Sequence, residues 1–131
     1  MDDTATTTTA TIVLADDEQF IAIAYKDGLE RAGYTVIVAQ DGDETLKRVS
    51  EALPDLVLLD LIMPKMNGFE VLKSLKADEA LAAIPVMVLS NLGQPTDEAE
   101  ARSYGAVDFI VKSDISLKDL LVRIEQVLAA V

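Results

Sequence analysis

The stretch Asp55–Gly68 reads Asp-Leu-Val-Leu-Leu-Asp-Leu-Ile-Met-Pro-Lys-Met-Asn-Gly. Its apolar run predicts a strand that is buried on both faces, as the strands of parallel sheets are. The run ends at one carboxylate, Asp60, and Pro64 and an Asn67-Gly68 turn follow. Because doubly wound sheets bind ligands at the carboxyl ends of their strands, Asp60 is predicted to face a ligand crevice.

The composition limits which chemistry the chain can perform. Its 131 residues predict one domain with a hydrophobic core, and they include no cysteine and no histidine. A disulfide framework, a thiolate metal site, Ser-His or Cys-His catalysis and a histidine phospho-carrier are therefore excluded. Any acid, base or nucleophile must be a carboxylate, a lysine or a hydroxyl.

The formal net charge of −12 argues against nucleic acid and against anionic membrane surfaces as partners. It suits a divalent cation or a basic protein surface, although most of the acidic residues need do no more than keep the domain in solution. No apolar run is long enough to span a bilayer. Residues 1–10 lack the features of a signal peptide and predict a disordered tail, so we expect a cytoplasmic location.

Strand and helix patterns alternate along the rest of the chain. The predicted strands, each followed by a helical pattern, are Thr11–Ala15, Tyr34–Ala39, the run before Asp60, Val86–Ser90 and Val107–Val111. This alternation predicts an α/β domain over residues 11–131: a three-layer, doubly wound, five-stranded parallel sheet in the flavodoxin-like order 2-1-3-4-5. Predicted N-caps of three of the helices are Asp43, Thr96 and Ser116.

Polar residues end or directly follow four of the predicted strands, and the carboxyl ends of parallel strands lie on one edge of a sheet. The residues are Asp16, Asp17, Asp60, Ser90 and Lys112. Three clustered carboxylates repel one another, and a bound Mg²⁺ ion, which prefers oxygen ligands, relieves that repulsion. A metal, an ammonium group and a hydroxyl around one carboxylate suit phosphoryl transfer to that carboxylate.

Each of these residues also has a simpler structural interpretation. Asp16 or Asp17 alone could be a helix N-cap, and the register with Asp60 is what favours metal binding over capping. Phe109 is equally consistent with plain core packing. Asp108 is interpreted as part of a solvated face.

From about Thr11 onward the chain resembles the receiver domain of bacterial response regulators in two-component systems. The residues that carry the resemblance are the pair Asp16-Asp17, the run Asp60–Pro64 with Asn67-Gly68, Ser90, and the segment Gly105–Lys112. The resemblance implies that Asp60 is the phosphoacceptor and that Ser90 and Lys112 contact the phosphoryl oxygens. It also implies that Mg²⁺ is bound by Asp16, Asp17, Asp60 and the Ile62 backbone carbonyl.

The resemblance implies a switch and partners as well. Phosphorylation would draw Ser90 inward, and Phe109 would rotate into the space that Ser90 leaves. The surface formed by the helix at 96–104, the strand at 107–111 and the helix after Ser116 would then bind a downstream protein. The donor would be a phosphohistidine on a sensor histidine kinase or a histidine phosphotransfer protein. We expect a stand-alone receiver, monomeric and able to dimerise when phosphorylated, that is no enzyme beyond its own phosphoryl transfer and slow dephosphorylation.

Two positions depart from the family pattern, and both are predicted to modulate the site. Ser113 follows Lys112 where the family usually has proline, which leaves open whether this peptide bond is cis or trans. Asn91 follows Ser90 where the family usually has a small residue. We expect Asn91 to affect the lifetime of the phosphoryl group.

Three other functions fit the chain less well. Phosphatases that form an aspartyl phosphate need a second aspartate two residues after the nucleophile, where this chain has Ile62. A flavin or nucleotide binder needs a glycine- or hydroxyl-rich loop after the first strand, where the acidic Asp16–Glu18 lies. A degenerate receiver that only binds proteins would not need the acidic pair, Asp60 and Lys112 together.

Overall fold

Five parallel strands form the centre of the protein. The computed structural model describes residues 9–130, so residues 1–8 of the predicted tail lie outside the described residues. The strands are β1 Thr11–Ala15, β2 Thr35–Ala39, β3 Leu56–Leu59, β4 Val86–Ser90 and β5 Asp108–Val111. The helices are α2 Gln19–Arg31, α3 Gly42–Ala52, α4 Gly68–Ala77, α5 Pro95–Ser103 and α6 Leu117–Ala129, with a 3₁₀ turn η1 at Lys112–Asp114.

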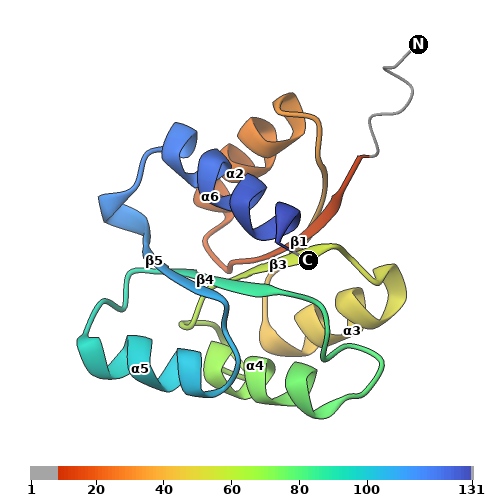
Figure 1. Ribbon diagram of the computed structural model, residues 1–131, viewed down its shortest axis with the longest axis vertical. Coiled ribbons are helices and arrows are strands. Elements are labelled where there is room, and N and C mark those ends of the chain that lie inside the picture. The colour runs from red at the N-terminus through yellow and green to blue at the C-terminus, as the bar shows by residue number, and fades with distance from the viewer. Residues whose placement is uncertain (1–8, 131) are drawn as a thin grey trace.

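The strand order is β2-β1-β3-β4-β5, and every neighbouring pair is parallel. Helices α2 and α6 cover one face of the sheet, and α3, α4 and α5 cover the other (Figure 1). The predicted three-layer, doubly wound fold is therefore confirmed. The order places β1 beside β3 at the centre of the sheet, where the carboxyl ends of these two strands lie together.

Each face of the sheet has its own apolar cluster. All four residues of β3 are buried, and they alternate between the clusters because successive side chains of a strand point to opposite faces. Val57 and Leu59 pack toward α3, α4 and α5, whereas Leu56 and Leu58 pack toward α2 and α6. The strand that ends at Asp60 is thus anchored on both sides.

Two glycines fix the loop between β3 and α4, which begins at Asp60. A Cβ atom on Gly68 would overlap the Asp60 carbonyl, and a Cβ on Gly42 would overlap the carbonyl of Met66. The loop therefore lies directly against the start of α3 on one side and against its own first residues on the other. Asn67 then caps α4, since its Oδ1 accepts from the Glu70 N–H at 3.1 Å.

Two of the predicted helix starts are wrong. The N-cap of α3 is Asp41, whose Oδ1 accepts from the Glu44 N–H at 2.8 Å, and Asp43 lies inside the first turn. The N-cap of α5 is Gln94 rather than Thr96, because Pro95 occupies the first helical position, where its missing N–H costs nothing. The third predicted cap is confirmed, since Ser116 Oγ accepts from the Asp119 N–H at 3.1 Å.

The prediction that Asp108 lies on a solvated face is also wrong. It is only 8% exposed, and Arg123 of α6 binds both of its carboxylate oxygens, at 2.9 and 2.5 Å. Arg102 of α5 lies 3.6 Å from the same carboxylate. This charge network ties both flanking helices to the edge strand β5.

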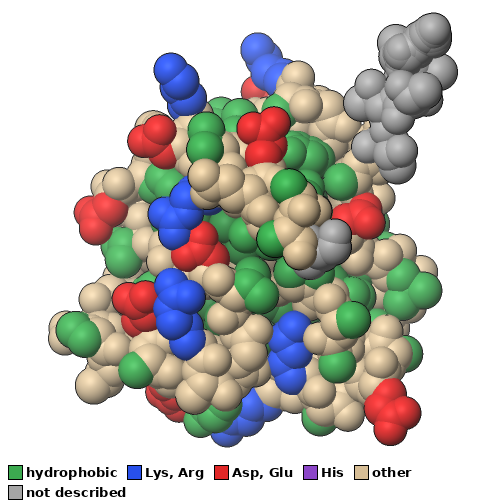
Figure 2. Space-filling view, viewed as in Figure 1, with side chains coloured by type: hydrophobic (Ala, Val, Ile, Leu, Met, Phe, Trp, Pro, Cys, Tyr) green, Lys and Arg blue, Asp and Glu red, His purple; other side chains and the backbone are tan. Residues whose placement is uncertain are grey.

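Charges of both signs are scattered over the face shown in Figure 2, with apolar side chains between them. Within residues 9–130, no helix combines the length and the apolar character that crossing a membrane requires.

Candidate functional site

Three carboxylates meet where β1 and β3 end. Asp16 and Asp17 follow β1 and Asp60 follows β3, and one oxygen of each lies within 4.8 Å of the others. Asp16 is 1% exposed and Asp60 is 4% exposed, whereas Asp17 is open to solvent. Such an all-oxygen set, partly buried and open on one side, fits a hard divalent cation that keeps some of its water ligands.

Lys112 brings the balancing positive charge from the end of β5. Its Nζ lies 2.7 Å from Asp16 Oδ2 and 2.8 Å from Asp60 Oδ2. The same atom lies 3.5 Å from Glu18 Oε1. The ammonium group is buried, and it lies between the two buried carboxylates. If this lysine left the site, both carboxylates would lose their buried counter-ion.

The pKa values of Asp16 and Lys112 differ from their ordinary values. Burial raises the pKa of Asp16, although hydrogen bonds from Lys112 and from the Glu18 N–H act in the opposite direction. Burial alone would lower the pKa of Lys112, but its hydrogen bonds to Asp16 and Asp60 and their charges outweigh burial and raise the pKa. Lys112 is thus a permanent cation at neutral pH.

Asp60 is held by donors on both of its carboxylate oxygens. Ser90 at the end of β4 donates its hydroxyl to Asp60 Oδ1 at 2.7 Å, and the Ile62 N–H donates to the same oxygen at 3.0 Å. Lys112 occupies the other oxygen. The Ile62 side chain, two residues beyond Asp60, is 55% exposed. The five polar residues predicted from the strand ends therefore do converge.

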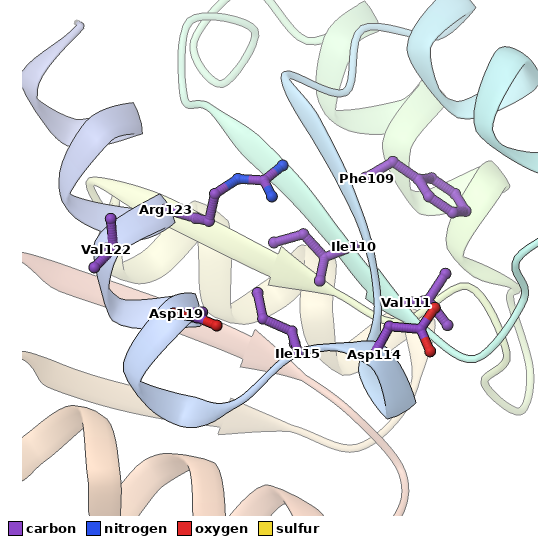
Figure 3. Close-up of a pocket in the computed structure, with 8 residues that line it drawn as sticks. All are labelled: Phe109, Ile110, Val111, Asp114, Ile115, Asp119, Val122 and Arg123. Carbon is purple, nitrogen blue, oxygen red and sulfur yellow. The ribbon is translucent and has the colours of Figure 1, made fainter.

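Phe109 lies on β5, on the opposite side of that strand from Ile110 (Figure 3). It is buried in the cluster that faces α3, α4 and α5, so in this structure it packs as a core residue. On the Ile110 side, a groove of about 450 Å³ runs between β5 and α6. Its walls include Ile115, Val122 and Arg123 (Figure 3).

The two positions that depart from the family pattern are in contact. Asn91 Oδ1 accepts a hydrogen bond from the Ser113 N–H at 3.2 Å. The peptide bonds of residues 9–130 are all trans, including the bond from Lys112 to Ser113. A proline at position 113 would have no N–H to donate, so this contact exists only because the chain has another residue there.

Comparisons with known proteins identify the family. Residues 12–125 match the response regulator receiver domain, and the chain belongs to this family, whose members act in two-component signalling. Protein PilH of Pseudomonas aeruginosa is 32% identical over 92% of this chain and 98% of its own length. The chemotaxis response regulator CheY4 of Vibrio cholerae has a structure that superposes with a TM-score of 0.85 at 30% identity, covering 92% of this chain and 99% of the other.

Longer proteins are also similar. The alkaline phosphatase synthesis transcriptional regulatory protein PhoP of Bacillus subtilis is 34% identical over 89% of this chain, which matches 48% of its length. The chain spans about half the length of this relative and of several others like it. The likeness to those proteins therefore concerns a receiver domain and not their whole activity.

Proposed function

We propose that the protein is a phospho-accepting switch in which Asp60 carries the phosphoryl group and Mg²⁺ is the required cofactor. The observation that supports this most strongly is the closed set of contacts around Asp60. Two other carboxylates each have an oxygen within 4.8 Å of an Asp60 oxygen, and an ammonium group and a hydroxyl lie within hydrogen-bond distance of Asp60. No other residue in this cluster offers a nucleophile with such pre-placed neighbours.

Asp16, Asp17, Asp60 and the Ile62 carbonyl would hold the metal ion. When bound, Mg²⁺ would neutralise negative charge on the phosphoryl oxygens. Phosphoryl transfer is catalysed mainly by positioning the reactants and by electrostatic stabilisation of this kind. Lys112 and Ser90 would turn from Asp60 toward the phosphoryl oxygens, with Lys112 donating from its ammonium group and Ser90 from its hydroxyl. Both atoms lie within 3 Å of Asp60, so neither has far to move.

In the transfer step, a carboxylate oxygen of Asp60 forms a bond to phosphorus as the bond between phosphorus and the donor nitrogen breaks. The electron pair of the broken bond stays on the donor imidazole, which ends as neutral or protonated histidine. Receiver domains take phosphoryl groups from histidine kinases or phosphotransfer proteins, and this chain contains no histidine. The donor histidine therefore lies outside these 131 residues.

The phosphorylated protein would act through the surface of α5, β5 and α6. Ser90, drawn to the phosphoryl group, and Phe109, the aromatic residue of β5, would transmit the change to this surface. The groove beside Ile110 and Arg123 lies on it and would receive a downstream protein. In this function the protein signals by binding, and its only chemistry is its own phosphorylation and slow dephosphorylation.

The direct test is incubation with acetyl phosphate and Mg²⁺, followed by intact-protein mass spectrometry. We expect one added phosphoryl group on wild type and on Asp27→Asn, which changes an exposed carboxylate of α2 that is not part of the three-carboxylate cluster. We expect none on Asp60→Asn or in the presence of excess EDTA. Addition to Asp60→Asn at the wild-type level would refute the assignment of the phosphoacceptor.

A further inference from the structure

The hydrogen bond between Asn91 and Ser113 joins the chain segments that directly follow Ser90 and Lys112, the two residues proposed to contact the phosphoryl group. Asn91 directly follows Ser90, and Ser113 directly follows Lys112. The two residues are 22 positions apart in the chain, and the Asn91 Oδ1 to Ser113 N distance is 3.2 Å. We infer that this contact, here called the 91–113 latch, is a positioning device that sets the lifetime of the phosphoryl group. The inference rests on the proposed phosphorylation of Asp60.

The latch lies where the sheet stops holding the two loops together. Strands β4 and β5 pair in parallel up to Ser90 and Val111, their last residues. Beyond that pair the chain after β4 leads to α5, and the chain after β5 enters the turn η1. Asn91 and Ser113 are therefore among the first residues without ladder hydrogen bonds, and the side chain of one replaces the missing backbone contact.

Together with the contacts to Asp60, the latch closes a ring. Ser90 Oγ is 2.7 Å from Asp60, and Lys112 Nζ is 2.8 Å from it. Chain connectivity then leads from Ser90 to Asn91 and from Lys112 to Ser113, and the latch joins these ends. A closed ring restrains both phosphoryl-binding groups relative to each other, whereas an open one would let each loop move alone.

The latch also forms part of the wall of a hollow that reaches the site. This hollow of about 440 Å³ lies between α2 and the two loops, and its lining includes Phe20, Tyr25, Asn91, Lys112 and Ser113. Separating the loops would widen the hollow on the side of Lys112. Water would then reach the phosphoryl group more easily, so loss of the latch should speed dephosphorylation.

The expected effect is modest because both groups of the latch are exposed to solvent. Water competes for such a bond, so its loss should shorten the phosphoryl lifetime by about two- to fivefold. The rate of phosphorylation by acetyl phosphate should change less, since Asp60 and the metal-binding carboxylates lie outside the two loops. A merely structural defect would instead slow phosphorylation as much as it shortens the lifetime.

The test uses a double-mutant cycle on the full chain. Asn91→Leu keeps the size of the side chain and removes the acceptor, and Ser113→Pro removes the N–H donor. Ser113→Ala is the matched control, because it removes the hydroxyl and keeps the N–H. Each protein is phosphorylated with acetyl phosphate and Mg²⁺, freed of the donor, and followed over time by intact mass. Hydrogen exchange of the Ser113 amide is measured in wild type and in Asn91→Leu.

We expect Asn91→Leu and Ser113→Pro each to shorten the lifetime, the double variant to be no worse than the poorer single variant, and Ser113→Ala to match wild type. The Ser113 amide should exchange faster in Asn91→Leu. Effects that multiply in the double variant, or a lifetime unchanged in Asn91→Leu, would overturn the latch. Wild type that takes up no phosphoryl group would instead refute the proposed function, and the role of the latch in setting a lifetime would fall with it.

Discussion

Replacing Lys112 with methionine should be the most damaging single change at the site. The ammonium group is the one cation within 3 Å of Asp16 and Asp60 in the described part of the chain, and both carboxylates are almost fully buried. Methionine fills similar space without charge. Two buried carboxylates would then face each other without a counter-ion, and the folded state could avoid this only by protonating one of them.

The size of the loss follows from that requirement. Protonating an ordinary aspartate at neutral pH costs about 4 kcal/mol, because its pKa lies about three units lower. Removing one partner of a buried ion pair generally costs about 3–5 kcal/mol. We therefore expect Lys112→Met to lose about 3–4 kcal/mol of unfolding free energy, a large share of the 5–15 kcal/mol that is typical of small domains.

The assay is urea unfolding in EDTA, followed by far-ultraviolet circular dichroism because the chain has no tryptophan. Lys118→Met, which changes an exposed lysine on α6, is the control and should stay within about 0.5 kcal/mol of wild type. Added Mg²⁺ should stabilise Lys112→Met more than it stabilises wild type, since the metal no longer competes with the ammonium group. Equal stability of Lys112→Met and Lys118→Met would show that the buried carboxylates do not need the Lys112 ammonium group.

Three further changes test other parts of the structure. Gly42→Ala should destabilise by about 1–3 kcal/mol in thermal unfolding, because its Cβ would overlap the Met66 backbone; a melting temperature equal to that of wild type would contradict the packing. The Glu44 N–H lowers the pKa of Asp41, so the charged form stabilises the fold above the ordinary aspartate pKa, and this contribution is lost as pH falls through the lowered value. Asp41→Asn should thus be less stable than wild type at neutral pH, and urea titrations should show the difference shrinking in acid; a constant difference would contradict this. Arg123→Met should cost about 1–3 kcal/mol in urea unfolding by leaving the buried Asp108 with only a distant partner, and an unchanged midpoint would show that the pair contributes nothing.

Much of the fold could be predicted from the sequence because its strongest signals are local. The apolar runs before Asp60 and in β4 can be buried only as central strands, and the alternation with helices then fixes the topology. The convergence of Asp16, Asp60 and Lys112 follows from that topology alone, since each residue comes directly after a strand. The same strand pattern therefore predicts both the fold and the position of the site.

The features that were mispredicted or missed depend on partners elsewhere in the sequence or on competing local signals. Asp108 looks like a surface acid until α6 brings Arg123 against it, 15 residues later. Asp41 and Asp43 are both reasonable caps for α3, and only the backbone geometry selects the first. The latch between Asn91 and Ser113 needs the exact ends of two strands, which periodicity does not define to within one residue.

In the proposed function, Asp60 itself carries the phosphoryl group. An acyl phosphate can be trapped by reduction with borohydride, which converts the phosphorylated aspartate to homoserine, and peptide mass spectrometry then locates the changed residue. After treatment with acetyl phosphate and Mg²⁺, phosphorylation of Asp60 predicts homoserine at position 60, and none at positions 16 or 17. Homoserine at either neighbouring carboxylate, or phosphorylated protein with an unreduced Asp60, would contradict it.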